Sequence, residues 1–263
     1  MNFFQAIFIG FIQGITEWLP ISSSGQVMLF LINLFKIPSL YAYEYSLILH
    51  LGTFFALVLK FRKELVKIIS NFLSFKWKET EKFLFFSTIL TGIIGMPIYV
   101  IFKTITISLN PELINGIIGL ALIFTGIVLY KGKKALSVRE NISFSDSIIA
   151  GICQGISIIP GISRSGITIG SLLTKGINQK KAVKMSFLMA IPAIVGIFFI
   201  EIPGYSSHIP LFLMLLALLS SFIFSFLTIE IMLKIAQKLN FSKFCFFFGI
   251  IAIMVSTISF LLG

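Results

Sequence analysis

Long apolar stretches alternate with short polar segments along almost the whole chain. Six stretches are long enough to cross a bilayer as helices, which takes about 20 residues. They lie at roughly 43–60, 83–102, 113–130, 185–203, 209–231 and 244–262. Two more apolar stretches, 3–35 and 146–173, are each broken near the middle by Pro, Ser and Gly. The pattern predicts an all-α integral membrane protein.

The two broken stretches are related in sequence. Gly10 to Gly25 reads GFIQGITEWLPISSSG, and Gly151 to Gly166 reads GICQGISIIPGISRSG. Gln, three Gly residues and two Ser residues match at one constant offset, and only the prolines differ by one position. We therefore expect a single transmembrane domain, 1–263, made of two internal repeats at approximately 1–133 and 146–263.

Composition and charge placement support a membrane location. Mean hydropathy is +1.03, with 57% hydrophobic and 12% charged residues, which exceeds what a soluble domain of this size can bury. The net charge is +11, but Lys and Arg concentrate in four short loops, 60–82, 131–139, 175–184 and 234–243. This is the positive-inside pattern of cytoplasmic loops, and no nucleic-acid partner is expected.

The same charges predict how the broken stretches lie. If 146–173 crossed the membrane, the basic loops on either side of it would face opposite compartments. A re-entrant hairpin keeps both on one side, and irregular backbone at membrane depth is tolerated where protein surrounds it. Each repeat is then a re-entrant helical hairpin plus three transmembrane helices, and the second repeat is inverted. Eight conventional spans are the alternative.

Glu17 and Arg164 are the charged residues inside the two hairpins. Ionisable groups within a membrane usually face a cavity and serve function, although a buried pair that only joins the repeats is the alternative. Hydroxyl groups surround both, from Ser22, Ser23 and Ser24 and from Ser163 and Ser165. Hydroxyls, free backbone N–H groups and Arg suit phosphate, and a carboxylate suits Mg²⁺ or Ca²⁺. The pattern predicts a diphosphate site for a lipid-tailed substrate.

These motifs resemble the two signatures of the undecaprenyl-diphosphate phosphatase (bacitracin-resistance) family. The first is Gln13 to Gly25, the second Pro160 to Gly166, and similarity extends over the full chain. The resemblance implies a phosphoric anhydride hydrolase that converts undecaprenyl diphosphate to the monophosphate. It also implies a divalent metal, Mg²⁺ or Ca²⁺, a multi-pass plasma-membrane location and an active site that opens outward.

Carried over by position, the resemblance assigns the site residues. Glu17 becomes a metal ligand or acid–base group with Gln13 as its weaker neighbour, Ser23 the candidate nucleophile, and Arg164 the residue that stabilises transferred charge. Attack by water is the alternative to attack by Ser23. The expected substrate-binding residues are Ser22, Ser24, Gly25, Gln26, Ser163, Ser165 and Gly166.

Three positions depart from the family pattern. Gln26 stands where a His is usual, Ser46 where many relatives are acidic, and Lys184 where an acidic residue is frequent. Because Gln cannot exchange a proton near neutral pH, a polyprenyl-phosphate transporter, a flippase or a non-cleaving paralogue is the alternative function. His50 is interpreted as a helix-packing hydrogen bonder. Expected partners are the prenyl diphosphate, membrane lipid and, as a further hypothesis, a second copy in a homodimer.

Overall fold

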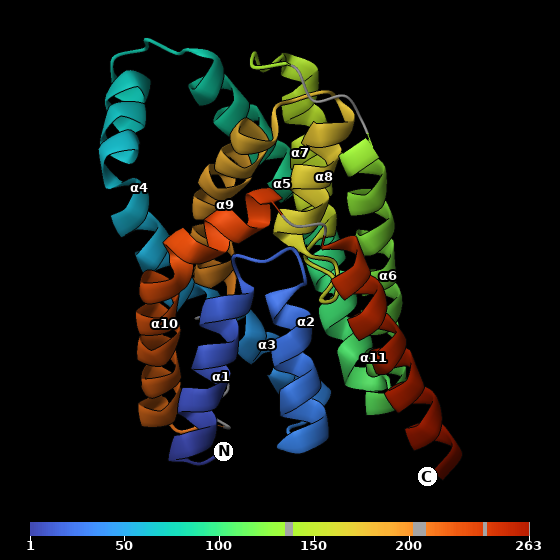
Figure 1. Ribbon diagram of the computed structural model, residues 1–263. Helices are drawn as coiled ribbons and strands as arrows, with labels where there is room; N and C mark the ends of the chain where they lie inside the picture. Colours follow the sequence, from blue (N-terminus) through green and yellow to red (C-terminus); the bar gives the residue numbers. More distant parts are fainter. Residues whose placement is uncertain (135–138, 202–208, 239–240, 263) are drawn as a thin grey trace.

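The computed structural model describes residues 1–134, 139–201, 209–238 and 241–262, and these residues are almost entirely helical, without a β-sheet. Figure 1 shows the helices running mostly along one common direction. In chain order they are α1 (Phe3–Thr16), α2 (Ser23–Leu29), η1 (Phe30–Leu34), α3 (Ser39–Ile48), α4 (His50–Leu73), α5 (Glu79–Ser108), α6 (Pro111–Lys134), α7 (Phe144–Ile156), α8 (Arg164–Thr174), α9 (Gln179–Glu201), α10 (Leu211–Lys238) and α11 (Ser242–Leu262).

Six helical segments in the described part are long and apolar enough to span a membrane, one for each predicted stretch. The all-α membrane fold is thereby confirmed. The first segment, Ser39–Leu73, is longer than predicted because α4 continues past Lys60 into what the sequence indicated as a basic loop. Lys, Glu and Arg are good helix formers, so charge in this segment does not end the helix.

The two broken stretches form helical hairpins, α1–α2 and α7–α8, whose helices are too short to be spans. In Figure 1 the hairpins enter from opposite ends of the molecule, and their tips lie near its middle. This arrangement disfavours eight conventional spans. Each second helix begins at a matching Ser: the Ser22 side chain accepts from the Gly25 N–H, and Ser163 accepts from Gly166. Ser is a preferred N-cap, so the repeated motif starts both helices in the same way.

Glycines in the first helix of each hairpin make equivalent close contacts. A Cβ at Gly10 would lie 2.3 Å from the Ala217 carbonyl oxygen of α10. A Cβ at Gly151 would lie 2.7 Å from the Ser87 carbonyl oxygen of α5. Small residues allow helix backbones to approach closely in membranes. A glycine therefore allows the first hairpin to pack closely on α10 and the second to pack closely on α5. The inverted symmetry of the repeats stays a prediction.

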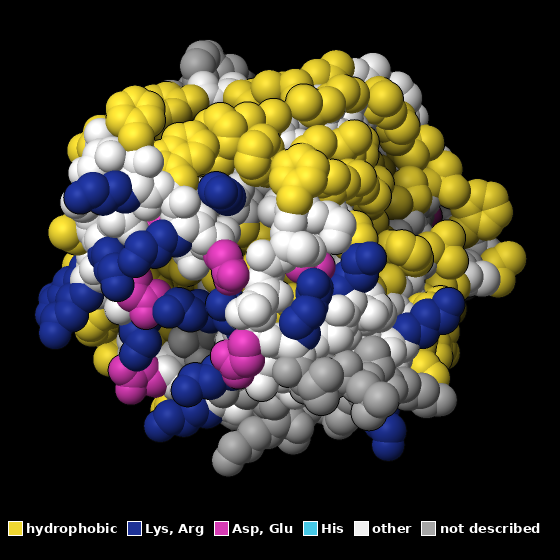
Figure 2. Space-filling view, turned by 90° about the horizontal axis from the view of Figure 1, so that it is seen from above, with side chains coloured by type: hydrophobic (Ala, Val, Ile, Leu, Met, Phe, Trp, Pro, Cys, Tyr) yellow, Lys and Arg dark blue, Asp and Glu magenta, His cyan; other side chains and the backbone are white. Residues whose placement is uncertain are grey.

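Charged side chains gather at one end of the molecule. Figure 2 looks onto that end and shows Lys and Arg with several Asp and Glu among them, beside extensive apolar surface. Lys184 contacts Glu64 at 2.9 Å, and Arg139 contacts Asp146 at 2.8 Å. The grouping of the described basic residues agrees with one cytoplasmic end, but which compartment this end faces stays a prediction.

Candidate active site

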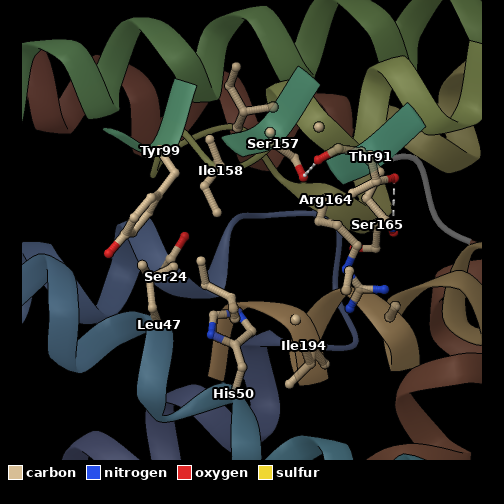
Figure 3. Close-up of a pocket in the computed structure, with 18 of the residues that line it drawn as sticks. Ser24, Leu47, His50, Thr91, Tyr99, Ser157, Ile158, Arg164, Ser165 and Ile194 are labelled. Atoms are coloured by element: carbon tan, nitrogen blue, oxygen red, sulfur yellow. Dashed lines mark hydrogen bonds between the residues drawn. The ribbon is translucent and has the colours of Figure 1, made fainter. Parts of the chain in front are cut away.

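The hairpin tips meet at a cavity of about 250 Å³. Its polar lining comes from both tips, with Glu17 and the serines of the first and Arg164 and the serines of the second. Helices α5 and α9 add a largely apolar flank, and Figure 3 shows His50, Arg164 and Ser24 around the same space. The cavity is therefore built from residues of both repeats, as the sequence predicts.

Glu17 lies at the centre of this polar group. Its side chain is almost completely buried and follows directly after α1. One carboxylate oxygen accepts from the Ser23 hydroxyl at 2.6 Å and from the Gln13 amide at 3.2 Å. The other accepts from the Arg164 guanidinium. A buried carboxylate needs such partners, because leaving it unpaired would cost several kcal/mol.

Arg164 is the first residue of α8 and extends from the second hairpin to the first. Besides Glu17, its guanidinium donates to the Ser186 carbonyl at 3.1 Å and lies 5.7 Å from the centre of the Phe187 ring. These contacts hold the planar group in one orientation at the cavity wall. Its remaining N–H donors give it the capacity to bind a phosphate as well.

The predicted serines line the cavity, and two of them also support the backbone. Ser22 has a left-handed backbone, with φ of 60°, and its hydroxyl accepts from the Gly161 N–H at 3.0 Å. This bond joins the two hairpin tips directly. Ser163 and Ser165 lie 3.3 Å apart through their hydroxyl oxygens, and Ser24 lies 3.5 Å from Ser22 in the same way. The hydroxyls of Ser22 and Ser163 are thus held by backbone N–H groups of the hairpin tips.

Three predicted binding residues lie outside the cavity lining. The Gln26 amide donates to the Ile21 carbonyl at 3.3 Å, within its own hairpin. Gly25 and Gly166 instead allow close packing: a Cβ at Gly25 would lie 3.0 Å from the Gly161 nitrogen, and one at Gly166 2.7 Å from the Thr125 methyl carbon. Their part in the site is to let the hairpin tips approach each other and α6.

His50 joins the site, although the sequence interpretation assigned it to helix packing. It begins α4 directly after the break at Leu49. Its Nε2 lies 3.1 Å from Glu17 Oε2 and 3.4 Å from Ser23 Oγ, while its Nδ1 contacts the Ser46 carbonyl at 2.8 Å. A signal was present, because His50 is an ionisable residue inside an apolar span, the same argument that singled out Glu17.

The oxygen atoms near Glu17 are of the hard kind that Mg²⁺ and Ca²⁺ prefer, although the Gln13 amide directs its N–H, and not its oxygen, to the carboxylate. Gln13 Oε1 is buried without a hydrogen-bond partner, and the Gln13 side chain lies against the Glu17 carboxylate. No cluster of three or more His, Cys, Asp or Glu occurs in the described part of the chain. Mg²⁺ does not require one, since it usually binds one or two carboxylates and takes its other ligands from water and substrate phosphate.

The fold and site together define an integral membrane protein with a polar, hydroxyl-rich cavity at the meeting point of two hairpins. Comparison with known proteins gives the family. Residues 6–254 match the family model described as "Bacitracin resistance protein BacA", and the chain belongs to this family.

Individual relatives match this chain over almost their full lengths. A Methanopyrus kandleri protein named "Undecaprenyl-diphosphatase" is 35% identical over 97% of this chain and 96% of its own. A protein of the same name from Methanococcoides burtonii is 36% identical, over 95% and 97%. Another from Carboxydothermus hydrogenoformans is 30% identical over 97% of each chain.

Proposed function

We propose that this protein is a membrane hydrolase that converts undecaprenyl diphosphate to undecaprenyl phosphate. The observation that carries the proposal is the single cavity in which Glu17, Ser23 and His50 face Arg164. The names of the relatives and the family support the same reaction. Its product is the lipid carrier used in cell-wall synthesis, and its activity accounts for bacitracin resistance in the family.

Substrate binding rests on Arg164 and the second hairpin. Arg164 lies at the N-terminus of α8, where backbone N–H groups and the helix dipole favour an anion. The hydroxyls of Ser163 and Ser165 flank it and supply further donors. In our proposal the guanidinium binds the diphosphate and stabilises the charge that spreads over the phosphoryl oxygens during transfer.

Ser23 is the proposed nucleophile, because its hydroxyl already donates to Glu17 at 2.6 Å. Attack forms a bond between Ser23 Oγ and the terminal phosphorus and breaks the bond from that phosphorus to the bridging oxygen. The Ser23 proton passes to Glu17 or His50, and the prenyl monophosphate leaves. Water then hydrolyses the phosphoserine and releases inorganic phosphate. Activation by a neighbouring base is what a serine nucleophile requires.

A divalent metal completes the proposal. Glu17 and Gln13 would hold Mg²⁺ or Ca²⁺, which would neutralise phosphate charge when bound. We place the reaction at the outer side of the plasma membrane, and the support for this orientation is that charged side chains gather at one end of the molecule, as expected for its cytoplasmic end. One chain supplies all the described lining residues, so the proposal needs no second subunit, and a homodimer stays a prediction.

The test is phosphate release from undecaprenyl diphosphate by purified protein in detergent micelles. Micelles have no second compartment, so a transporter or flippase gives no signal in this assay. We expect inorganic phosphate and undecaprenyl phosphate in equal amounts, with Mg²⁺ or Ca²⁺ present and not after chelation. Well-folded protein that binds the lipid without releasing phosphate would refute the hydrolase and restore the transport alternative.

A further inference from the structure

The apolar flank of the cavity contains an unfilled stretch between α5 and α9. Gly92 of α5 and Gly196 of α9 both line the cavity. Both are also exposed. A Cβ added at either position would meet nothing within 4 Å. Because neither residue has a side chain, no atoms fill the cavity wall at these two positions.

Other contacts tie α5 and α9 together on one side of this opening. Lys103 of α5 contacts Glu201 of α9 at 3.1 Å and Glu44 of α3 at 2.8 Å. Tyr99, one turn earlier on α5, accepts a hydrogen bond from Lys103 at 3.1 Å and lines the cavity. Two residues after Gly92, α5 also rests on the second hairpin, where a Cβ at Gly155 would lie 2.8 Å from Ile94. These contacts hold α5 in place beside the cavity.

The cavity is too small for a polyprenyl chain. Its volume is about 250 Å³. A diphosphate group fits that space, but a tail of 55 carbons does not. The tail must therefore leave through the wall. Next to the gap, Ile89 and Ile93 are 44% and 60% exposed on α5, as expected for a surface in contact with hydrocarbon.

We infer that the part of the cavity wall formed by α5 and α9, with Gly92 and Gly196 in it, is the lateral portal through which the prenyl tail passes from the cavity into the lipid. The inference rests on the proposed function and adds the path of the tail and two residues that determine tail acceptance. The diphosphate lies at the hairpin tips, and the first isoprene units cross the wall between α5 and α9. The absent side chains are what make the passage wide enough.

Filling the portal tests the inference. In Gly92→Phe and Gly196→Phe, we expect kcat/KM for undecaprenyl diphosphate to fall at least tenfold, mainly through KM. The matched control is Ile93→Phe, which adds a ring at the next position of α5, outside the cavity lining. It should retain the parent rate. The same kcat/KM in all three variants would show that the inferred portal is wrong.

Thiol labelling gives a readout that does not depend on turnover. Gly92→Cys, Gly196→Cys and Ile93→Cys proteins are treated with a maleimide, with signal from the native cysteines subtracted. We expect the undecaprenyl methylene-diphosphonate to protect the first two and not the third, whereas methylene-diphosphonate without a tail protects none.

The outcomes separate the two proposals. Unprotected cysteines in a protein that hydrolyses undecaprenyl diphosphate would overturn the portal and leave the function intact. Protected cysteines in a protein that hydrolyses nothing would support the portal and overturn the phosphatase.

Discussion

At the scale of single residues, Glu17 is the group that the other proposed reaction residues contact. It accepts hydrogen bonds from Ser23 and Gln13, pairs with Arg164 and lies beside His50. Each of these neighbours thus both contacts the buried carboxylate and has a role in the proposed reaction. Variants must therefore be judged by folding as well as by rate, because removal of one partner of a buried ion pair typically costs 3–5 kcal/mol.

Ser23 gives the most specific residue-level prediction. With ³²P in the terminal phosphate, acid quenching during turnover should trap label on Ser23 of the native enzyme. Ser23→Ala should carry no label and should be slower by at least about 100-fold. Label-free native enzyme together with an active Ser23→Ala would show that water attacks directly.

His50 gives a second prediction. His50→Gln keeps a hydrogen-bonding side chain but removes the imidazole, so phosphate release should fall by about 100-fold, the lower end of the range of general acid–base catalysis. Steady-state rates measure the effect, and an unchanged melting temperature would exclude misfolding. An unchanged rate would return His50 to the packing role that the sequence interpretation gave it.

The sequence predicted the convergence of Glu17 and Arg164 because both are charged residues in repeated, apolar segments. It did not predict that His50 would join them. His50 is far from Glu17 in the sequence. It lies at the break at Leu49, where α3 ends and α4 begins, and no local sequence pattern predicts that break. Gln26 shows the converse: its place in a motif suggested binding, but the α2 backbone directs its amide to Ile21.

At the scale of elements, the hairpin tips depend on backbone conformations that few residues adopt. Gly161 has φ of +86°, and a Cβ there would lie 2.5 Å from the Ile118 carbonyl oxygen of α6. The position combines a left-handed backbone with a close approach to another helix. Motif repetition and hydropathy predicted the hairpins themselves, whereas the extension of α4 to Leu73 was missed, because hydropathy reports membrane depth and not helix ends.

Gly161→Ala should therefore destabilise the second hairpin. The left-handed backbone alone costs about 1–2 kcal/mol with a side chain, and the carbonyl contact adds to it. We expect a lower melting temperature in detergent and weaker phosphate release. Gly196→Ala is the stability control, since its Cβ meets open space and Ala favours the helix by about 1 kcal/mol. Equal melting temperatures would contradict this account of the tip.

At the scale of the whole molecule, charge placement predicts orientation. The basic loops lie at one end, and the turn between α5 and α6 lies at the other. Asn110→Cys, in that exposed turn, should react with an impermeant maleimide added to intact cells, and Lys131→Cys should not. Both should react after permeabilisation. The opposite labelling pattern would reverse the orientation and place the active site toward the cytoplasm.

The most direct test of the central claim compares two purified variants for phosphate release from undecaprenyl diphosphate. Glu17→Gln is nearly isosteric but removes the carboxylate that binds Ser23 and Arg164. Thr257→Ala changes an exposed hydroxyl that bonds only within α11. We predict loss of at least about 100-fold for Glu17→Gln and a native rate for Thr257→Ala. A folded Glu17→Gln protein with the native rate would show that the reaction does not depend on this cavity.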